Sequence, residues 1–177
     1  MFETVRNAFK IKDLRKKLFY TFFALIVVRI GSQLPVPGVK YEAIREMFNS
    51  QKSLDFFNQL TGGSFEQMSI FALNITPYIT ASIIIQLLTI AIPRLEELHK
   101  DGEEGRKKLT EYTRYVTIGL SVLESAAMAI GFGNSGYLTD DKITFTSVSV
   151  IIVSLTAGSA FLMWLGEQIT EKGVGNG

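Results

Sequence analysis

The sequence predicts an all-α integral membrane protein with four transmembrane helices and one short additional helix. Two observations carry this prediction: residues 67–93 form 27 consecutive uncharged residues, and residues 143–166 form 24 more. A membrane-spanning helix needs about 20 mostly apolar residues, so each run is long enough to cross the hydrocarbon core. Two further apolar stretches, 18–36 and 115–132, contain one charge each. The alternative is the buried helical core of a soluble protein, in which uncharged runs of this length are rare.

The composition excludes several classes of protein. The 177 residues include no Cys and one His, which excludes disulfide scaffolds, Cys-ligated zinc, thiol catalysis and His-cluster metal sites. A net charge of +1 leaves no strongly basic arm for nucleic acid. The sequence also lacks a phosphate-binding loop of the G-x-x-x-x-G-K type and an H-E-x-x-H motif. We therefore expect no catalytic residues, no cofactor and no metal.

The N-terminal region predicts a basic anchor followed by the first transmembrane helix. Residues 1–17 carry six Lys and Arg among apolar residues, which suits an amphipathic helix on the inner membrane surface or an ordinary basic flank. Residues 18–36 exceed signal-peptide length, contain Arg29 and lack a small-residue cleavage site, so we expect a retained helix. Pro35, Pro37 and Gly38 end it.

The segment 37–66 is too polar to span the membrane and is predicted to lie on the external side. Within it, residues 53–60 suit a short helix that stops at Gly62 and Gly63. Eight helical residues extend about 12 Å, far less than the roughly 30 Å hydrocarbon core, so this helix lies at the outer surface or dips inward. Ser64 and Gln67 have the spacing of a capping box that would open the next helix.

The second predicted span, 67–92, is unusually rich in hydrogen-bonding side chains. They are Asn74, Thr76, Thr80, Ser82, Gln86 and Thr89. Such side chains face other helices or a wet cavity rather than lipid. Ile75, Ile79 and Ile83 form one stripe along the helix, and Thr80, Ile83 and Gln86 form a neighbouring stripe. Spacing alone favours helix packing over a pore-lining role, with Pro77 producing a kink.

Small residues in the third span, 115–132, and the fourth, 143–166, predict close helix packing. They recur at four-residue spacing as Ser121, Ser125 and Ala129 in one, and Ser154 and Gly158 in the other.

Arg29 and Glu124 are charged residues inside predicted spans, which makes them functional candidates. Both lie about 15–18 Å from the cytoplasmic ends of their spans, at a depth that allows pairing. Alternatively, Arg29 extends towards the membrane surface, and Glu124 is protonated or faces water.

The distribution of Lys and Arg predicts the orientation. With four spans, the N-terminus, the loop 93–114 and the C-terminal residues 167–177 share one side, and that side holds 13 basic residues. The other side, which includes the loop 133–142, holds 4. Basic residues are enriched in cytoplasmic loops, so both termini are expected in the cytoplasm.

Several strings in the sequence resemble the N-terminal part of the SecY family, the channel subunits of the bacterial protein-conducting translocon. They cover the chain from end to end and comprise residues 29–38, 62–73, 75–88, 105–108, 112–115 and 166–177. The resemblance implies about ten helices in two inverted halves around a central pore. This chain would supply helices one to four and would stop before helix five.

The resemblance also implies roles for individual residues. Ile75 and Ile79 match a ring of apolar side chains that constricts the pore, and Thr80, Ile83 and Gln86 match a lateral gate towards lipid. Residues 54–63 match a plug that closes the channel from outside, with Leu54, Phe56, Phe57, Leu60, Gly62 and Gly63 as its residues. In the cytoplasmic loop, the candidate partner contacts are Arg106, Lys107, Lys108 and Arg114.

By this resemblance, the chain passes unfolded secretory polypeptides across the bacterial cytoplasmic membrane and releases apolar segments into lipid. The implied partners are SecE and SecG subunits, the SecA motor, the ribosome, the lipid bilayer, secretory and membrane polypeptides, and the C-terminal half of the same subunit. An alternative is half of a small-solute or ion transporter built on the second helix, with Asn74, Thr76 and Thr80 as ligands. A third is a membrane scaffold without transport.

Overall fold

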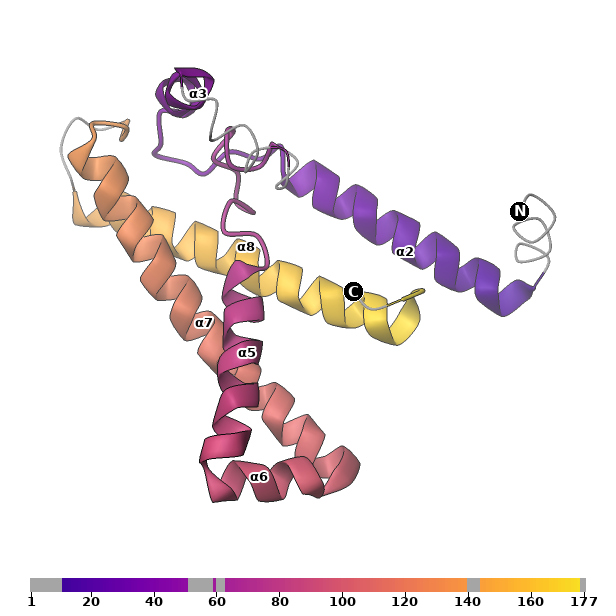
Figure 1. Cartoon of the computed structure of the whole chain (residues 1–177). Helices are drawn as coiled ribbons and strands as arrows, with labels where there is room; N and C mark the ends of the chain where they lie inside the picture. Colours follow the sequence, from indigo (N-terminus) through magenta and orange to yellow (C-terminus); the bar gives the residue numbers. More distant parts are fainter. Residues whose placement is uncertain (1–10, 51–58, 60–62, 140–143, 176–177) are drawn as a thin grey trace.

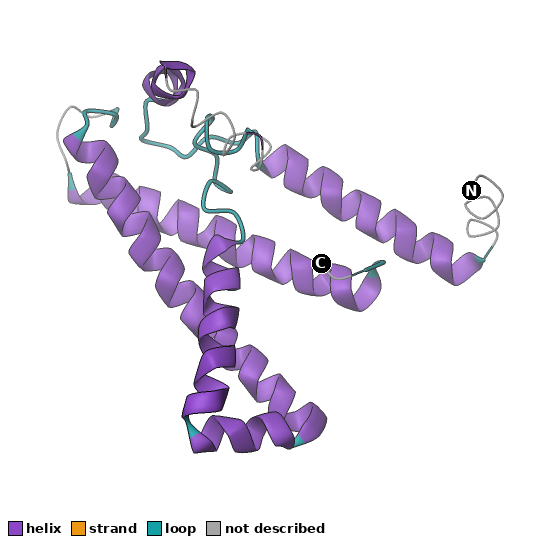
Figure 2. Cartoon of the chain, in the orientation of Figure 1, coloured by secondary structure: helices purple, strands orange, loops and turns teal. Residues whose placement is uncertain are grey.

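The structure, a computed structural model, describes residues 11–50, 59, 63–139 and 144–175. Figures 1 and 2 show the helices formed by these residues, joined by turns. Their bounds are Lys12–Gly31 (α2), Tyr41–Ser50 (α3), Thr76–Ala91 (α5), Pro93–Lys100 (α6), Gly102–Asn134 (α7) and Phe145–Lys172 (α8). The all-helical prediction is therefore confirmed for the described part of the chain. The predicted N-terminal amphipathic helix falls largely, and the predicted short helix at 53–60 almost entirely, outside the described residues.

Helices α7 and α8 form the centre of the bundle. At 1.5 Å per residue, their 33 and 28 residues give lengths of about 50 Å and 42 Å. They pack against each other, while α5 packs on α7 and α2 packs on α8, as Figure 1 shows. Both central helices are long and apolar enough to cross a membrane.

The helices α5 and α6 together also pass as one span, bent by 103° at the break between them. The described helices thus contain two or three candidate spans. Helix α2 is not among them, because basic residues occupy its first turns and it ends at Gly31, before the predicted end of the apolar stretch. The count of four spans remains a prediction.

The second helix begins later than the sequence predicts. Residues 63–75 form consecutive turns, and the helix starts only at Thr76. Ser64 and Gln67 therefore do not open a helix. Asn74, with φ +54°, takes a left-handed conformation that breaks any helix continuing through it. Pro77 lies in the first turn, where its missing N–H is not needed, so it marks a helix start and not the predicted kink.

The predicted cytoplasmic loop 93–114 is itself helical. Pro93 begins α6 directly after the bend, and Gly102 begins α7. Gly105 makes the corner between these two helices possible, because a Cβ there would lie 1.8 Å from the carbonyl oxygen of Leu98. The chain therefore turns back through two short corners.

A seam of small and hydroxyl-bearing residues runs along α7 and is buried at every fourth position. It consists of Gly105, Leu109, Thr113, Thr117, Ser121, Ser125 and Ala129. Ser121 Oγ donates to Ser159 Oγ on α8 at 3.2 Å, and Ser125 Oγ lies 3.3 Å from Thr156 Oγ1. The predicted close packing of this stripe is confirmed.

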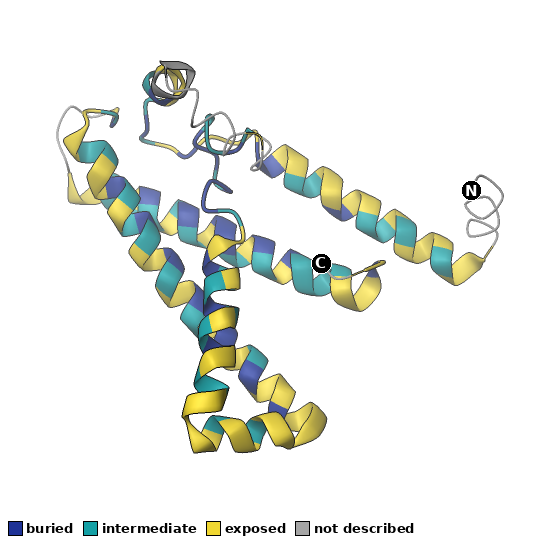
Figure 3. Ribbon diagram, viewed as in Figure 1, coloured by how far each residue is buried: buried dark blue, intermediate teal, exposed yellow. Residues whose placement is uncertain are grey.

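The hydrophobic core lies at one end of the bundle, where turns meet the end of α7 and the start of α8; Figure 3 shows buried residues concentrated there and along the inner helix faces. The segment 34–40 pairs with two others. Val36 N donates to Met68 O at 2.8 Å and Ile70 N to Leu34 O at 2.9 Å. On the other side, Lys40 N donates to Tyr137 O at 2.8 Å. These bonds fix the turns that lead into α5.

Candidate functional site

Helix α5 has one buried face and one open apolar face. Pro77, Ala81 and Ile85 are buried and face inward. The opposite face presents Ile75, Ile79 and Ile83, with 43%, 48% and 52% of their surface exposed, and continues through Leu87 and Ile90. Side chains at i, i+4 and i+8 share a helix face, which explains why the predicted isoleucine stripe is continuous. We call Ile75, Ile79, Ile83, Leu87 and Ile90 the open face of α5.

The polar residues of α5 divide between its two faces. Gln86 is exposed within the open face, three residues after Ile83 and four before Ile90, and its Nε2 donates to Ser82 Oγ at 3.3 Å within the same helix. Thr80 is partly buried. The structure thus brings Gln86 beside the isoleucine stripe, while its hydrogen bond is made within α5 in the described part of the chain.

A cavity of about 280 Å³ lies between α5, α6 and α7. Its lining includes Ser82, Gln86 and Thr89 from α5, His99 from α6 and Thr113 from α7. Ser82 and Thr89 thus face neighbouring helices. This fits the expectation that the hydrogen-bonding side chains of this helix face other helices or a wet cavity.

The turns at 63–75 directly precede α5, which carries the open face. Met68, fully buried, and Asn74 both have positive φ, +45° and +54°. Phe71 is buried, and its ring stacks on that of Phe161 in α8, with centroids 5.9 Å apart and an interplanar angle of 5°. Since Ile75 is the last residue of this segment and the N-cap of α5, the turns determine where α5 begins.

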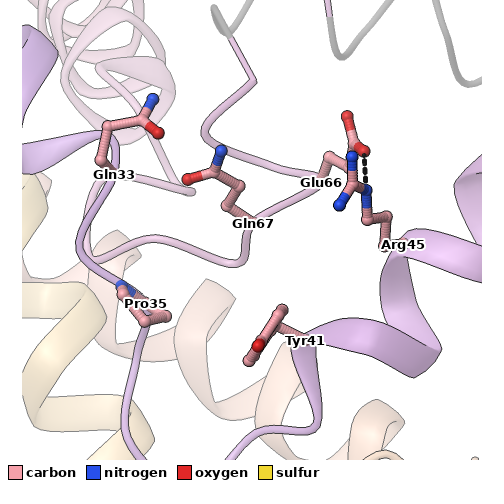
Figure 4. Close-up of a pocket in the computed structure, with 6 residues that line it drawn as sticks. All are labelled: Gln33, Pro35, Tyr41, Arg45, Glu66 and Gln67. Atoms are coloured by element: carbon pink, nitrogen blue, oxygen red, sulfur yellow. Dashed lines mark hydrogen bonds and ion pairs between the residues drawn. The ribbon is translucent and has the colours of Figure 1, made fainter.

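A second cavity, of about 390 Å³, opens beside the same turns (Figure 4). It is lined by Gln33, Pro35, Tyr41, Arg45, Glu66 and Gln67. Arg45 Nε donates to Glu66 Oε1 at 2.9 Å, so an ion pair joins α3 to the turns. Both side chains belong to the segment predicted to be external.

Of the predicted plug residues, only Gly63 is among the described residues. Its φ of +85° lies in the left-handed region that favours glycine. Leu54, Phe56, Phe57, Leu60 and Gly62 fall outside the described residues.

The two intramembrane charges lie on different helices. Arg29 is exposed in the last turn of α2, and Glu124 is half-buried on α7. Helix α2 packs mainly against α8. Whether the two pair stays a prediction.

At the end of the bundle predicted to be cytoplasmic, Arg114, one of the candidate partner-contact residues, forms an ion pair within the chain. Arg114 donates from Nε and Nη2 to the two carboxylate oxygens of Glu167 on α8, each at 2.8 Å. This hydrogen bonding to Glu167 raises the pKa of Arg114, so its guanidinium stays charged. Sequence reasoning missed Glu167, because no local pattern links residues 53 positions apart. Arg106, Lys107 and Lys108 are exposed on the first turns of α7.

The apolar candidate spans, the buried hydroxyl seam and the open face define a multi-pass helical membrane protein. Comparison with known families and proteins assigns it more narrowly. The SecY family model matches residues 69–177. The chain belongs to the SecY family, as the quoted strings indicated.

Three relatives, each named Protein translocase subunit SecY, illustrate the similarity. The protein from Halalkalibacterium halodurans is 48% identical over 181 residues, covering 100% of this chain and 41% of the relative. The protein from Pseudomonas aeruginosa is 46% identical, covering 94% and 38%. The protein from Streptomyces coelicolor is 43% identical, covering 100% and 43%. The chain therefore spans about two fifths of the length of these relatives. Their shared name denotes a translocase subunit, which agrees with the expectation that the chain is not a catalytic enzyme.

Proposed function

We propose that this chain forms the N-terminal part of the channel subunit of a bacterial protein-conducting translocon. In this role it helps to pass unfolded secretory polypeptides across the cytoplasmic membrane and to release apolar segments sideways into lipid. Membership of the SecY family and the names of the relatives support the class of activity. The observation that carries the assignment within the chain is the open apolar face of α5.

Ile75 and Ile79 supply this chain's share of the pore ring. A constriction made of branched apolar side chains excludes ions by dewetting, and it grips an extended polypeptide without sequence preference. Both residues are nearly half exposed on one helix face, which leaves them free to meet a translocating chain.

Thr80, Ile83 and Gln86 form this chain's side of the lateral gate. A gate must open often, so its closed contact must be weak. The exposed Gln86 amide donates one N–H to Ser82 within its own helix, and its second N–H and carbonyl oxygen are the groups it offers across the gate. An apolar segment that parts the gate then meets the open face of α5 on its way to lipid.

The plug is assigned to residues 54–63, next to the turns that precede α5. Both termini lie in the cytoplasm. There Arg106, Lys107 and Lys108 are the contact residues for the SecA motor or the ribosome, because their side chains are exposed and basic. SecE and SecG subunits and the C-terminal half of the same subunit complete the channel.

The pore ring is tested by Ile79→Asn in the full-length subunit, assembled with its partner subunits in planar bilayers. A polar side chain hydrates the constriction, so ion conductance of the resting channel rises, whereas Ile79→Leu leaves it low. Leu123→Asn is the matched control, since Leu123 on α7 is 68% exposed but lies off the open face.

Equal conductance of Ile79→Asn and the parent contradicts the pore ring. An increase restricted to one small solute instead favours the transporter alternative, in which Asn74, Thr76 and Thr80 act as ligands.

A further inference from the structure

We infer that the turns at 63–75 act as a strap that sets the start of α5, and that Gly31, Gly158 and Phe71 are its positioning residues. The inference rests on the proposed function, because it adds to the pore ring the contacts that hold Ile75 and Ile79 in place. None of the three touches the open face itself.

The strap crosses α8 at Gly158 with no space to spare. A Cβ at Gly158 would lie 1.9 Å from the backbone carbonyl oxygen of Ile70. Real Cβ atoms do not approach other atoms this closely. Because the obstacle is backbone and not the end of a side chain, any larger residue at position 158 must push the strap away from α8.

The strap also crosses the end of α2 at Gly31, through a side chain. A Cβ at Gly31 would lie 2.0 Å from Cε2 and 2.5 Å from Cζ of Phe71. The Phe71 ring therefore lies between the end of α2 and Phe161 of α8, on which it stacks. One buried ring thus connects two helices that are far apart in sequence.

The backbone of the strap is held in conformations that a free chain would seldom adopt. Met68 is a fully buried non-glycine residue with positive φ, a conformation that persists where surrounding contacts over-determine it. Asn74 also has positive φ, which asparagine adopts more readily. Hydrogen bonds flank Met68: Val36 N donates to Met68 O, and Ile70 N donates to Leu34 O. Since Asn74 is followed at once by Ile75, displacement of the strap moves the first turn of α5.

The two glycines predict different patterns of rescue. Leu has no atoms at the Cε2 and Cζ positions of Phe71, so Phe71→Leu removes the two closest contacts created by Gly31→Ala; the third, at 2.9 Å from Cδ2, is relieved by a change of the leucine rotamer. The same change leaves the Ile70 carbonyl in place, so it does not relieve Gly158→Ala. A loss of stability unrelated to these contacts would not produce this asymmetry, and the labelling of the first turn of α5 distinguishes a displaced strap from a loss of stability alone.

The experiment uses the full-length subunit in membranes with two readouts. The first is ion leak. The second is the rate at which a water-soluble maleimide labels Thr76→Cys, a probe on the first, exposed residue of α5 in a segment that contains no native Cys. Gly119→Ala is the matched control, because a Cβ at Gly119 meets nothing within 4 Å. Phe161→Leu, which removes the ring stack without adding a clash, replaces Gly158→Ala if that variant does not accumulate.

We expect Gly158→Ala and Gly31→Ala to change the labelling rate several-fold and to raise the leak, with Phe71→Leu restoring only the Gly31 variant. A changed labelling rate without a leak supports the strap and contradicts the pore ring. Labelling rates equal to that of Gly119→Ala in both glycine variants and in Phe161→Leu overturn the inference. Rescue of both glycine variants by Phe71→Leu overturns it as well.

Discussion

The ion pair between Arg114 and Glu167 gives a quantitative prediction about the packing of α7 on α8. Two parallel N–H···O bonds of 2.8 Å join the guanidinium to the carboxylate. Removing either partner, in Arg114→Gln or Glu167→Gln, is expected to lower the free energy of unfolding. The double variant should lose little more than either single one, because the interaction can be lost only once.

The exposure of the pair limits the size of the effect. The side chains are 46% and 22% exposed, so solvent and salt screen much of the attraction. Exposed pairs contribute about 0.2–1 kcal/mol, and the bidentate geometry places this pair near the upper end of that range. A coupling of about 1 kcal/mol corresponds to a roughly fivefold change in the ratio of folded to unfolded protein.

The measurement is a double-mutant cycle on the detergent-solubilised subunit, followed by chemical unfolding at low and at high salt. We expect a coupling that is clear at low salt and that shrinks at high salt. A coupling near zero at low salt refutes the structural role. If Arg114→Gln then weakens binding of a cytoplasmic partner while leaving unfolding unchanged, Arg114 is a partner contact as the sequence first suggested.

Three further predictions concern other parts of the chain. Deleting residues 54–63 from the full-length subunit removes the proposed plug, so ion leak in planar bilayers should rise; an unchanged leak contradicts the plug assignment. Gln86→Leu removes the amide proposed to bond across the gate; because an interhelical hydrogen bond in a membrane is worth about 0.6–2 kcal/mol, the hydrophobicity at which a graded Leu segment inserts into lipid should shift. If the insertion threshold is the same in the variant and the parent, Gln86 is an ordinary packing residue and not part of a gate. Gly105→Ala places a Cβ 1.8 Å from Leu98 O, so thermal unfolding should show a free energy of unfolding lower by about 1–3 kcal/mol, a loss that Gly119→Ala lacks. Equal stabilities of the two variants would contradict the close packing of Gly105 against Leu98.

Features that depend on local composition could be predicted from the sequence. Residues 145–166 of the uncharged run lie within α8, and small residues every four positions on α7 contribute to its buried seam. Charge depletion and four-residue periodicity are properties of single segments. They can therefore be recognised without knowledge of the tertiary contacts. The same reasoning found the isoleucine stripe, which shares one face of α5.

The start of the second helix could not be found in this way. Hydropathy treats residues 67–75 as part of a span, although they form turns in which Met68, Ser69 and residues 71–73 are buried, and in which Ile70 and Phe71 contact α8. Non-helical backbone is tolerated at such a place only where protein satisfies its polar groups, and Ile70 N is satisfied by Leu34 O. Leu34 lies 36 positions before Ile70, so no local sequence pattern predicts this hydrogen bond. In retrospect, Pro77 carried a usable signal, since proline is favoured in the first turn of a helix.

Gly158 shows how one residue can fit a pattern and still have a different role. Its spacing from Ser154 predicts close approach of another helix, and close approach is what the structure shows. The neighbour is the strap backbone at Ile70 and not a helix, whereas Ser159, one position later, faces the seam of α7. Small residues in a sequence indicate that another segment packs closely at that position. Which segment it is can be seen only in the tertiary structure.

Helix α5 is held by different kinds of contact from those that hold α7 and α8 together. Helices α7 and α8 are joined by hydroxyl hydrogen bonds along the seam and by the Arg114–Glu167 pair at one end. Within the described residues, α5 packs chiefly on α7 and α6 through one face, and its N-terminal end is held by the strap. Sliding α5 therefore exchanges apolar contacts for other apolar contacts and breaks few hydrogen bonds, which in a membrane costs little. A ring and a gate must move without unfolding their surroundings, and a helix that packs through one face, as α5 does on α7 and α6, suits such movement.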